Sequence, residues 1–124
     1  MMEAHFILTL DTTAPTVTIE SGPDYSTIFE KTGPDISTFE WSVDKKFTEY
    51  KICAVPSNTA LHSVGRVIST ANGSINMAGI GLFEEKALIS SSIKGRDLRT
   101  ASPEDGAKII KIFVKDEVGN WSVN

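Results

Sequence analysis

The sequence predicts an all-β domain in which two antiparallel sheets form a sandwich of about seven to nine strands. Apolar and polar residues alternate along short stretches, clusters of Gly, Pro, Asn and Asp separate these stretches, and no useful window repeats apolar residues every 3.6 positions. A barrel made of the same strands is the alternative, but the number and spacing of the strands favour the sandwich. The 124 residues fit a single domain, residues 1–124.

The expected strands follow one another along the whole chain. Each is short, alternates in polarity and is rich in β-branched or aromatic residues, as half-buried strands are. Their positions are 6–10, 16–20, 39–43, 50–55, 108–115 and 121–123. We expect Trp41 to be the large central residue of the core and Cys53, the single cysteine, to be a buried free thiol.

Two turns predict hairpins. Asp44-Lys45-Lys46 lies between strands 39–43 and 50–55 and predicts that these two strands pair. Asn72-Gly73 is the strongest short hairpin signal, because both residue types tolerate a positive φ, and it predicts pairing of 66–70 with 74–78.

Composition excludes several classes of protein. The chain has 12 Lys and Arg against 16 Asp and Glu, a formal net charge of −4, whereas a nucleic-acid module needs a basic face. No stretch is long and apolar enough to insert into a membrane. Because the N-terminus has neither a basic region nor a cleavage site, we expect synthesis in the cytoplasm without a signal peptide.

Several stretches resemble immunoglobulin-like domains of bacteria and phages. Residues 11–19, DTTAPTVTI, resemble the entry strand of these domains, and 105–122, with Asp116 and Gly119-Asn120, are similar to their last two strands. Residues 39–52 resemble the second and third strands of fibronectin type III domains. The resemblance implies an immunoglobulin-like, Greek-key sandwich, the kind of domain found in phage and prophage structural proteins.

The chain also departs from this family. The sequence Ala107-Lys108-Ile109 stands where many such domains place a corner tyrosine, so that tie is absent or made otherwise. Residues 1–14 form an additional N-terminal strand or extension, and 56–88 form a long segment rich in Gly and Ser that resembles an insertion.

Catalytic chemistry is not indicated, and we expect no enzyme. The sequence contains no HExxH, no paired CxxC and no glycine-rich phosphate loop, and its two histidines lack partners at metal-ligand spacing. Asp116 and Asn120, with Asp11 across the domain end, are weak candidates for a calcium site, because they supply fewer oxygens than calcium prefers. The favoured interpretation is that Asp116 caps the turn with its own side chain, without a cofactor.

Two classes of function therefore stay open. The first is a structural or interaction module of a phage or prophage particle (tail, baseplate or capsid surface), with contacts to protein subunits or the cell surface through 56–66 and 71–85. The second is a lectin-like, carbohydrate-binding module that stacks glycans on Trp121, Tyr25 or Phe83. A fragment of a bacterial cell-surface adhesin is a weaker third possibility.

Two further surfaces are candidates for contact. Arg96 and Arg99, beside Asp97, form a basic group that we interpret as a surface charge cluster, with an anionic sugar as the alternative ligand. An uncovered edge strand, together with the apolar segment 6–10, makes a homo-oligomer plausible, because this segment could pair with a neighbouring chain.

Overall fold

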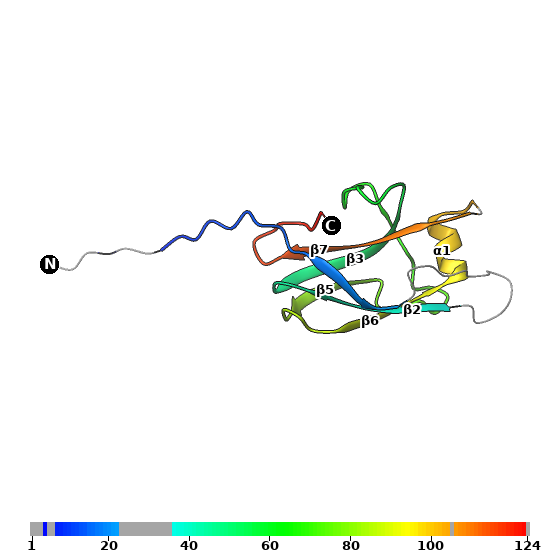
Figure 1. The fold of residues 1–124 in the computed structure, drawn as a ribbon, viewed down its shortest axis with the longest axis horizontal. Coiled ribbons are helices and arrows are strands. Elements are labelled where there is room, and N and C mark those ends of the chain that lie inside the picture. Colours follow the sequence, from blue (N-terminus) through cyan, green and yellow to red (C-terminus); the bar gives the residue numbers. More distant parts are fainter. Residues whose placement is uncertain (1–3, 5–6, 23–35, 105, 124) are drawn as a thin grey trace.

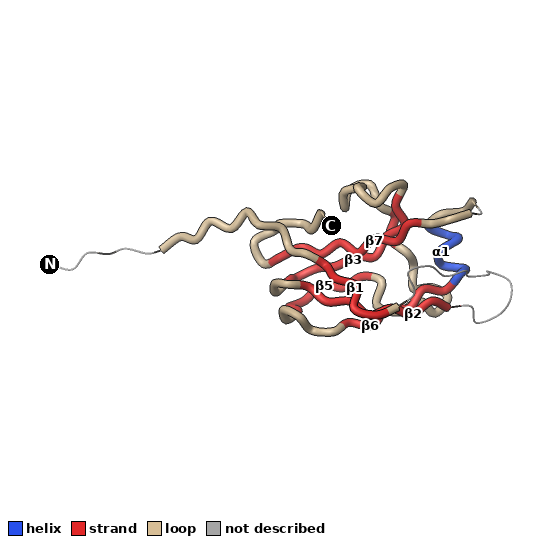
Figure 2. The backbone as a smooth tube through the Cα atoms, viewed as in Figure 1, coloured by secondary structure: helices blue, strands red, loops and turns tan. Residues whose placement is uncertain are grey.

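The computed structural model describes residues 4, 7–22, 36–104 and 106–123. Within them the fold is mostly β, with antiparallel pairing throughout, as the sequence predicts (Figures 1 and 2). The elements in chain order are β1 (Val17–Ser21), β2 (Ile36–Val43), β3 (Phe47–Val55), β4 (Arg66–Val67), β5 (Ala78–Phe83), β6 (Ile89–Lys94), α1 (Gly95–Ala101) and β7 (Ile109–Asp116).

The strands form two sheets. In the first sheet β2 lies between β1 and β6. In the second sheet β3 is central: β7 pairs along the whole of one edge, while β5 and the short β4 share the other edge. Figure 2 shows α1 at one end of the two sheets, and the N-terminal segment leaves the domain at the opposite end.

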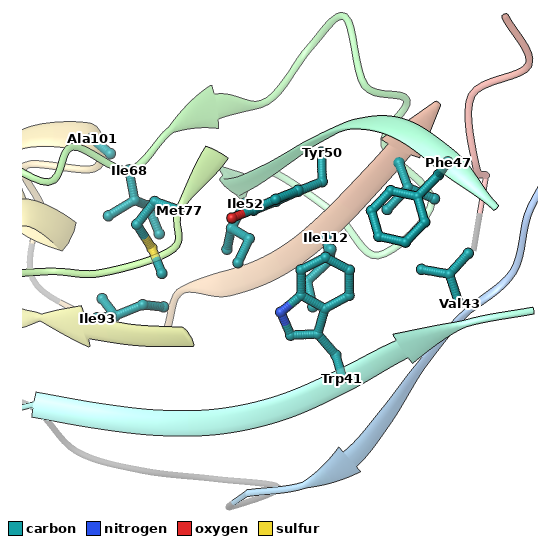
Figure 3. Close-up of a cluster of buried hydrophobic side chains, with 11 residues drawn as sticks. Trp41, Val43, Phe47, Tyr50, Ile52, Ile68, Met77, Ile93, Ala101 and Ile112 are labelled. Carbon is teal, nitrogen blue, oxygen red and sulfur yellow. The ribbon is translucent and has the colours of Figure 1, made fainter. Parts of the chain in front are cut away.

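The two sheets face each other across one hydrophobic core, in which Trp41 is central, as predicted (Figure 3). The Trp41 indole is fully buried, and its ring centroid lies 5.1 Å from that of Tyr50 on the opposite sheet. Its Nε1–H donates a 3.0 Å hydrogen bond to Ser91 Oγ of β6, so the one polar atom of this side chain is satisfied.

The second sheet is covered on both faces. On its outer face Cys53, Val55 and Phe113 form a second buried cluster with Ala60 of the following loop, and Trp121 packs against it. The prediction that Cys53 is a buried free thiol is confirmed, and burial raises its pKa. Apolar and polar residues alternate along β3 and β7, yet both faces of these strands contain buried residues, because Ala60 and Trp121 cover part of the outer face.

Both expected hairpins are wrong. Asp44-Lys45-Lys46 connects β2 to β3, but these strands belong to different sheets, so the turn crosses from one sheet to the other. The strands that flank Asn72-Gly73 do not pair with each other either. Instead, β4 and β5 each pair with β3, and the turn at Asn72 is held by hydrogen bonds to the distant carboxylate of Asp97.

Two further elements differ from expectation. The helix α1 is missing from the sequence interpretation because its seven residues are too short to display a helical repeat. Residues 7–10 are extended but form no strand with any described segment, and the last expected strand is reduced to one bridge between Lys115 and Trp121. Among the described residues, no helix is long and apolar enough to cross a membrane.

Candidate functional site

The three calcium candidates, Asp11, Asp116 and Asn120, do meet at one end of the domain. The Lys45 ammonium lies between the two carboxylates, with its Nζ 2.9 Å from Asp11 Oδ2 and 2.9 Å from Asp116 Oδ2. Asn120 Nδ2 donates to Asp116 Oδ2 at 3.1 Å and to the Asp11 carbonyl at 3.0 Å. The cluster therefore joins the N-terminal segment, the crossing between sheets and the end of β7.

Asp116 also caps its own turn, as the sequence predicts. Its Oδ1 accepts hydrogen bonds from the backbone N–H groups of Val118, at 3.1 Å, and Asn120, at 2.8 Å. Gly119 has a φ of 96°, a conformation that favours glycine at this place in the turn. The spacing of Asp116, Gly119 and Asn120 is thus accounted for by a local turn.

The charges in this cluster stabilise one another. The hydrogen bond from Lys45 lowers the pKa of Asp11, and the same contact, with that to Asp116, raises the pKa of Lys45. Burial alone would raise the pKa of Asp116, but the hydrogen bonds from Lys45, Asn120 and Val118 outweigh burial and lower it. All three groups are therefore charged at neutral pH.

The position of Lys45 bears directly on cation binding. Its ammonium occupies the space between the two carboxylates, so a calcium ion bound by both would first have to displace it. No group of three or more His, Cys, Asp or Glu within the described ranges is arranged to hold a metal ion. The geometry supports an anchor for the N-terminal segment: Lys45 Nζ also donates to the Thr13 carbonyl at 2.7 Å.

Trp121 lies half-buried on the outer face of the second sheet, with its ring engaged by the protein itself. The His62 imidazole stacks on the indole, with ring centroids 4.4 Å apart and an interplanar angle of 10°. The ammonium groups of Lys51 and Lys115 lie 5.0 and 5.7 Å from the ring centroid. Desolvation, followed by the nearby Lys51 charge, lowers the pKa of His62 and favours the neutral imidazole in this stack.

The other two aromatic candidates do not join Trp121. Phe83 ends β5 and stacks on Phe47 at the edge of the inter-sheet core, with centroids 4.8 Å apart and an interplanar angle of 16°. Tyr25 lies outside the described residues. The two candidates within the described residues, Phe83 and Trp121, therefore form no shared platform, since Phe83 packs in the core and Trp121 on the outer face.

The basic group is only partly a surface cluster. Arg96 and Arg99 are exposed on α1, but Asp97 between them is completely buried, which corrects its expected place at the surface. Asp97 accepts hydrogen bonds from Asn72 Nδ2 at 2.9 Å, from Asn72 N at 3.2 Å and from Ser74 N at 3.2 Å. Burial would raise the pKa of Asp97, but the hydrogen bonds from Ser74 and Asn72 prevail and lower it.

The sequence interpretation missed two charged residues that organise the structure. Lys45 contacts partners 34 and 71 residues away, and no local pattern signals such contacts. Lys111 is buried on β7, where its Nζ donates to the carbonyls of Asn58, Ala60 and Val123 at 2.9 to 3.0 Å. The alternation of Lys111 with apolar neighbours predicts a solvent-facing side chain, whereas the loop after β3 covers it.

Exposed apolar side chains mark the segments that the sequence predicts as contact regions. Within 71–85, Ile80 and Leu82 of β5 are 85% and 64% exposed, and within 56–66, Leu61 and Val64 are more than half exposed. Ile80 is opposite Glu49 in the register and shares its outward face, and Leu82 follows two positions later on the same strand. β5 has the sequence AGIGLF and no polar side chain, so both of its faces are apolar although one of them is exposed.

No family model matches this chain, and no curated protein or solved structure matches it either.

Proposed function

We propose that this chain is a non-enzymatic, immunoglobulin-like β-sandwich module that makes contacts with other protein subunits in a phage or prophage particle. The strand order supports an immunoglobulin-like, Greek-key arrangement: β1, β2 and β6 share one sheet, and β3 pairs with β7 in the other. In such domains strands A, B and E lie in one sheet, and strands C and F pair in the other. In this comparison β1, β2 and β6 correspond to A, B and E, and β3 and β7 correspond to C and F. The particle context follows from the resemblance of residues 11–19 and 105–122 to phage immunoglobulin-like domains.

The observation that carries the contact role is the outer face of β5. Ile80 and Leu82 expose 85% and 64% of their surface on one edge strand, next to the core position of Phe83. Exposed apolar side chains gathered on one face are typical of protein interfaces, since their burial is favourable by about 25 cal/mol per Å². A surface of this kind fits a protein partner better than a glycan, which needs an open aromatic face together with polar groups.

The experiment follows the chain into particles. In the strain that carries the gene, we would induce lysis, separate particles on a density gradient and detect the chain with an antibody. The proposal expects the chain to sediment with the particles, and the double variant Ile80→Glu/Leu82→Glu to lose most of this association while its circular dichroism is unchanged. Val118→Glu is the matched control, because Val118 is 62% exposed outside this surface.

Two outcomes would overturn the proposal. If the wild-type chain stays at the top of the gradient, it is not a component of the particle. If instead the purified chain binds reproducibly on a glycan array and Trp121→Ala abolishes the binding, the carbohydrate-binding alternative replaces it. Trp121 and Ile80 lie at opposite edges of the same outer face, with Lys115 and Glu49 between them, so both sets of variants are measured in both assays.

A further inference from the structure

The hydrophobic core is open along one side of the domain. A groove runs between β1 and β7, lined by Val17 and Ile19 of one sheet and by Ile109, Ile110 and Ile112 of the other. Ile19 is opposite Trp41 in the register and therefore faces the other sheet, yet it is 56% exposed. A core-facing isoleucine with this exposure shows that the described residues leave the groove without a cover.

The backbone of β7 is also unpaired along this groove. Val114 uses its outward N–H and C=O groups to bond Ser122, through Oγ at 3.0 Å and N at 2.8 Å. In an antiparallel ladder, Ile112 and Ile110 direct their backbone groups to the same side as Val114. No described segment pairs with them there, so this part of β7 is an open edge beside an apolar groove.

The chain carries a segment that is chemically suited to this groove. Residues 7–10 leave the domain in an extended conformation (Figure 1), and Ile7, Leu8 and Leu10 are 87%, 83% and 90% exposed. In a strand, Leu8 and Leu10 share one face and Ile7 and Thr9 the other. Such a segment has the apolar side chains to fill the groove and the free backbone groups to extend the sheet.

The segment of the same chain is too short to reach the far part of its own groove. Asp11 is held beside Asp116 by Lys45, at the far end of β7 from Ile110. A strand that folds back from residue 11 to residue 7 reaches about 13 Å, which brings it no further than Ile112, whereas Ile110 lies six residues, or about 20 Å, from Asp116. A second copy has no such restriction.

We propose that residues 7–10 of one copy bind in the β1–β7 groove of a second copy as an added strand. Their backbone pairs with Ile110 and Ile112, and Leu8 and Leu10 pack against Ile19 and its neighbours in the groove. Because the donated segment and the groove are different surfaces, each bound pair still offers one free segment and one free groove, so the contact generates head-to-tail chains. This assembly is independent of the contact role of Ile80 and Leu82.

The test uses the 124-residue chain and two complementary variants. Leu8→Asp/Leu10→Asp removes the donor face and keeps the groove, and Ile19→Asp charges the groove and keeps the donor. Sedimentation velocity across a concentration series should show wild-type oligomers that grow with concentration, and each variant alone should weaken self-association by about tenfold or more. Leu88→Asp, at a 59% exposed leucine outside both surfaces, should assemble as the wild type does.

Mixing the two variants gives the sharpest result. The intact segment of Ile19→Asp fits the intact groove of Leu8→Asp/Leu10→Asp, so a one-to-one mixture should form dimers that grow no further. Circular dichroism and thermal unfolding of each variant alone confirm that it is folded, and Ile109→Asp serves as a second groove variant if Ile19→Asp does not fold. The proposal is overturned if the wild type is monomeric throughout, if either variant assembles normally, or if the mixture forms no dimer.

Discussion

Two buried carboxylates, Asp97 and Asp116, lie at opposite ends of the molecule and are held by different kinds of partner. Asp97 of α1 accepts hydrogen bonds from the neutral N–H groups of Asn72 and Ser74, which belong to a turn more than 20 residues earlier. Asp116 at the end of β7 binds the Lys45 ammonium and caps the turn that directly follows it. Both have a lowered pKa, although burial alone would raise it.

The difference lies in what each network holds together. Asp97 joins α1 to the 72–74 turn, and Lys94 N donates to Ser74 Oγ at 2.8 Å, so the turn, β6 and α1 depend on one carboxylate. Around Asp116 the contacts are redundant: Lys45 also binds Asp11 and the Thr13 carbonyl, and the turn residues Val118 and Gly119 are open to water. We therefore expect the first site to be the more sensitive to substitution.

Asp97→Ala should have the largest effect. It leaves the N–H of the buried Ser74 without an acceptor and removes both contacts of Asn72, and a buried donor without a partner costs about 1–3 kcal/mol. We expect the free energy of unfolding to fall by about 3 kcal/mol, measured by urea unfolding followed through tryptophan fluorescence. The matched control is Asp44→Ala, which removes an exposed carboxylate that accepts one bond from Thr16 N and should cost less than about 1 kcal/mol. Equal losses in the two variants would show that burial of Asp97 does not set its importance.

Asp116→Ala should cost less, about 1–2 kcal/mol, because water can reach the freed N–H groups of its turn. The same urea titration measures this effect. A double-mutant cycle with Lys45→Met then separates the ion pair from the turn cap, since Lys45 binds the Asp116 carboxylate whereas the backbone of the turn binds Oδ1 of the same group, and the cycle cancels the contacts of Lys45 with Asp11 and Thr13. A loss larger than that of Asp97→Ala would reverse the order inferred from the two networks.

The same contrast explains what could be predicted from the sequence. The turn at Asp116 was predictable because the bonds that cap its backbone join residues within four positions, and β3 and β7 were predictable because they alternate over eight or nine residues. Trp41 and Cys53 were predicted as core residues on the same basis. In each case the deciding interactions are local or repeat with a period of two.

The remaining features depend on partners that the local sequence does not identify. Asn72-Gly73 has the same turn propensity whether its flanks pair with each other or with β3, and its contact with the distant Asp97 has no signal in the local sequence. Asp44-Lys45-Lys46 suits a turn within one sheet and a crossing between two sheets equally well. The exposure of Ile80 and the open groove beside Ile19 follow from which strands lie at the sheet edges.

Acid should weaken the fold through both carboxylates. Each has a folded pKa below its ordinary value of 3.8, so the unfolded chain binds protons more readily. The stabilisation is therefore complete above the unfolded pKa and is lost as the pH falls through the folded pKa. We expect the free energy of unfolding to decrease below about pH 4. The decrease should be smaller than the loss caused by Asp97→Ala, because the lowered pKa values keep a fraction of the Asp97 and Asp116 side chains ionised just below this pH. Asp97→Asn, which cannot titrate, should show a flatter decline in urea titrations over this range. An unchanged slope would assign the acid sensitivity to other groups.

The smallest effect is expected for Asp11→Ala, and it should be local. Asp11 is partly exposed, and its Oδ1 accepts the Thr13 N–H at 3.0 Å while Oδ2 binds Lys45. Exposed ion pairs contribute little to the free energy of unfolding, so we expect no measurable change in urea titrations. Amide hydrogen exchange at Thr13 should nevertheless become faster, because its N–H loses its acceptor.

Thr16 provides the control for Asp11→Ala within the same molecule, because its N–H is bound by Asp44 Oδ1 at 2.8 Å and its carbonyl accepts from Asp44 N at 3.2 Å. If only Thr13 exchanges faster, the N-terminal segment is held at two separate points. Asp11 holds the part around Thr13, and the buried Pro15 together with Thr16 holds the part next to β1. Equal acceleration at Thr16 would show that Asp11 and Lys45 hold the whole segment from 11 to 16. In that case the starting point of the exposed strand 7–10 is set by the Asp116 cluster, and Lys45→Met should release it in the same way.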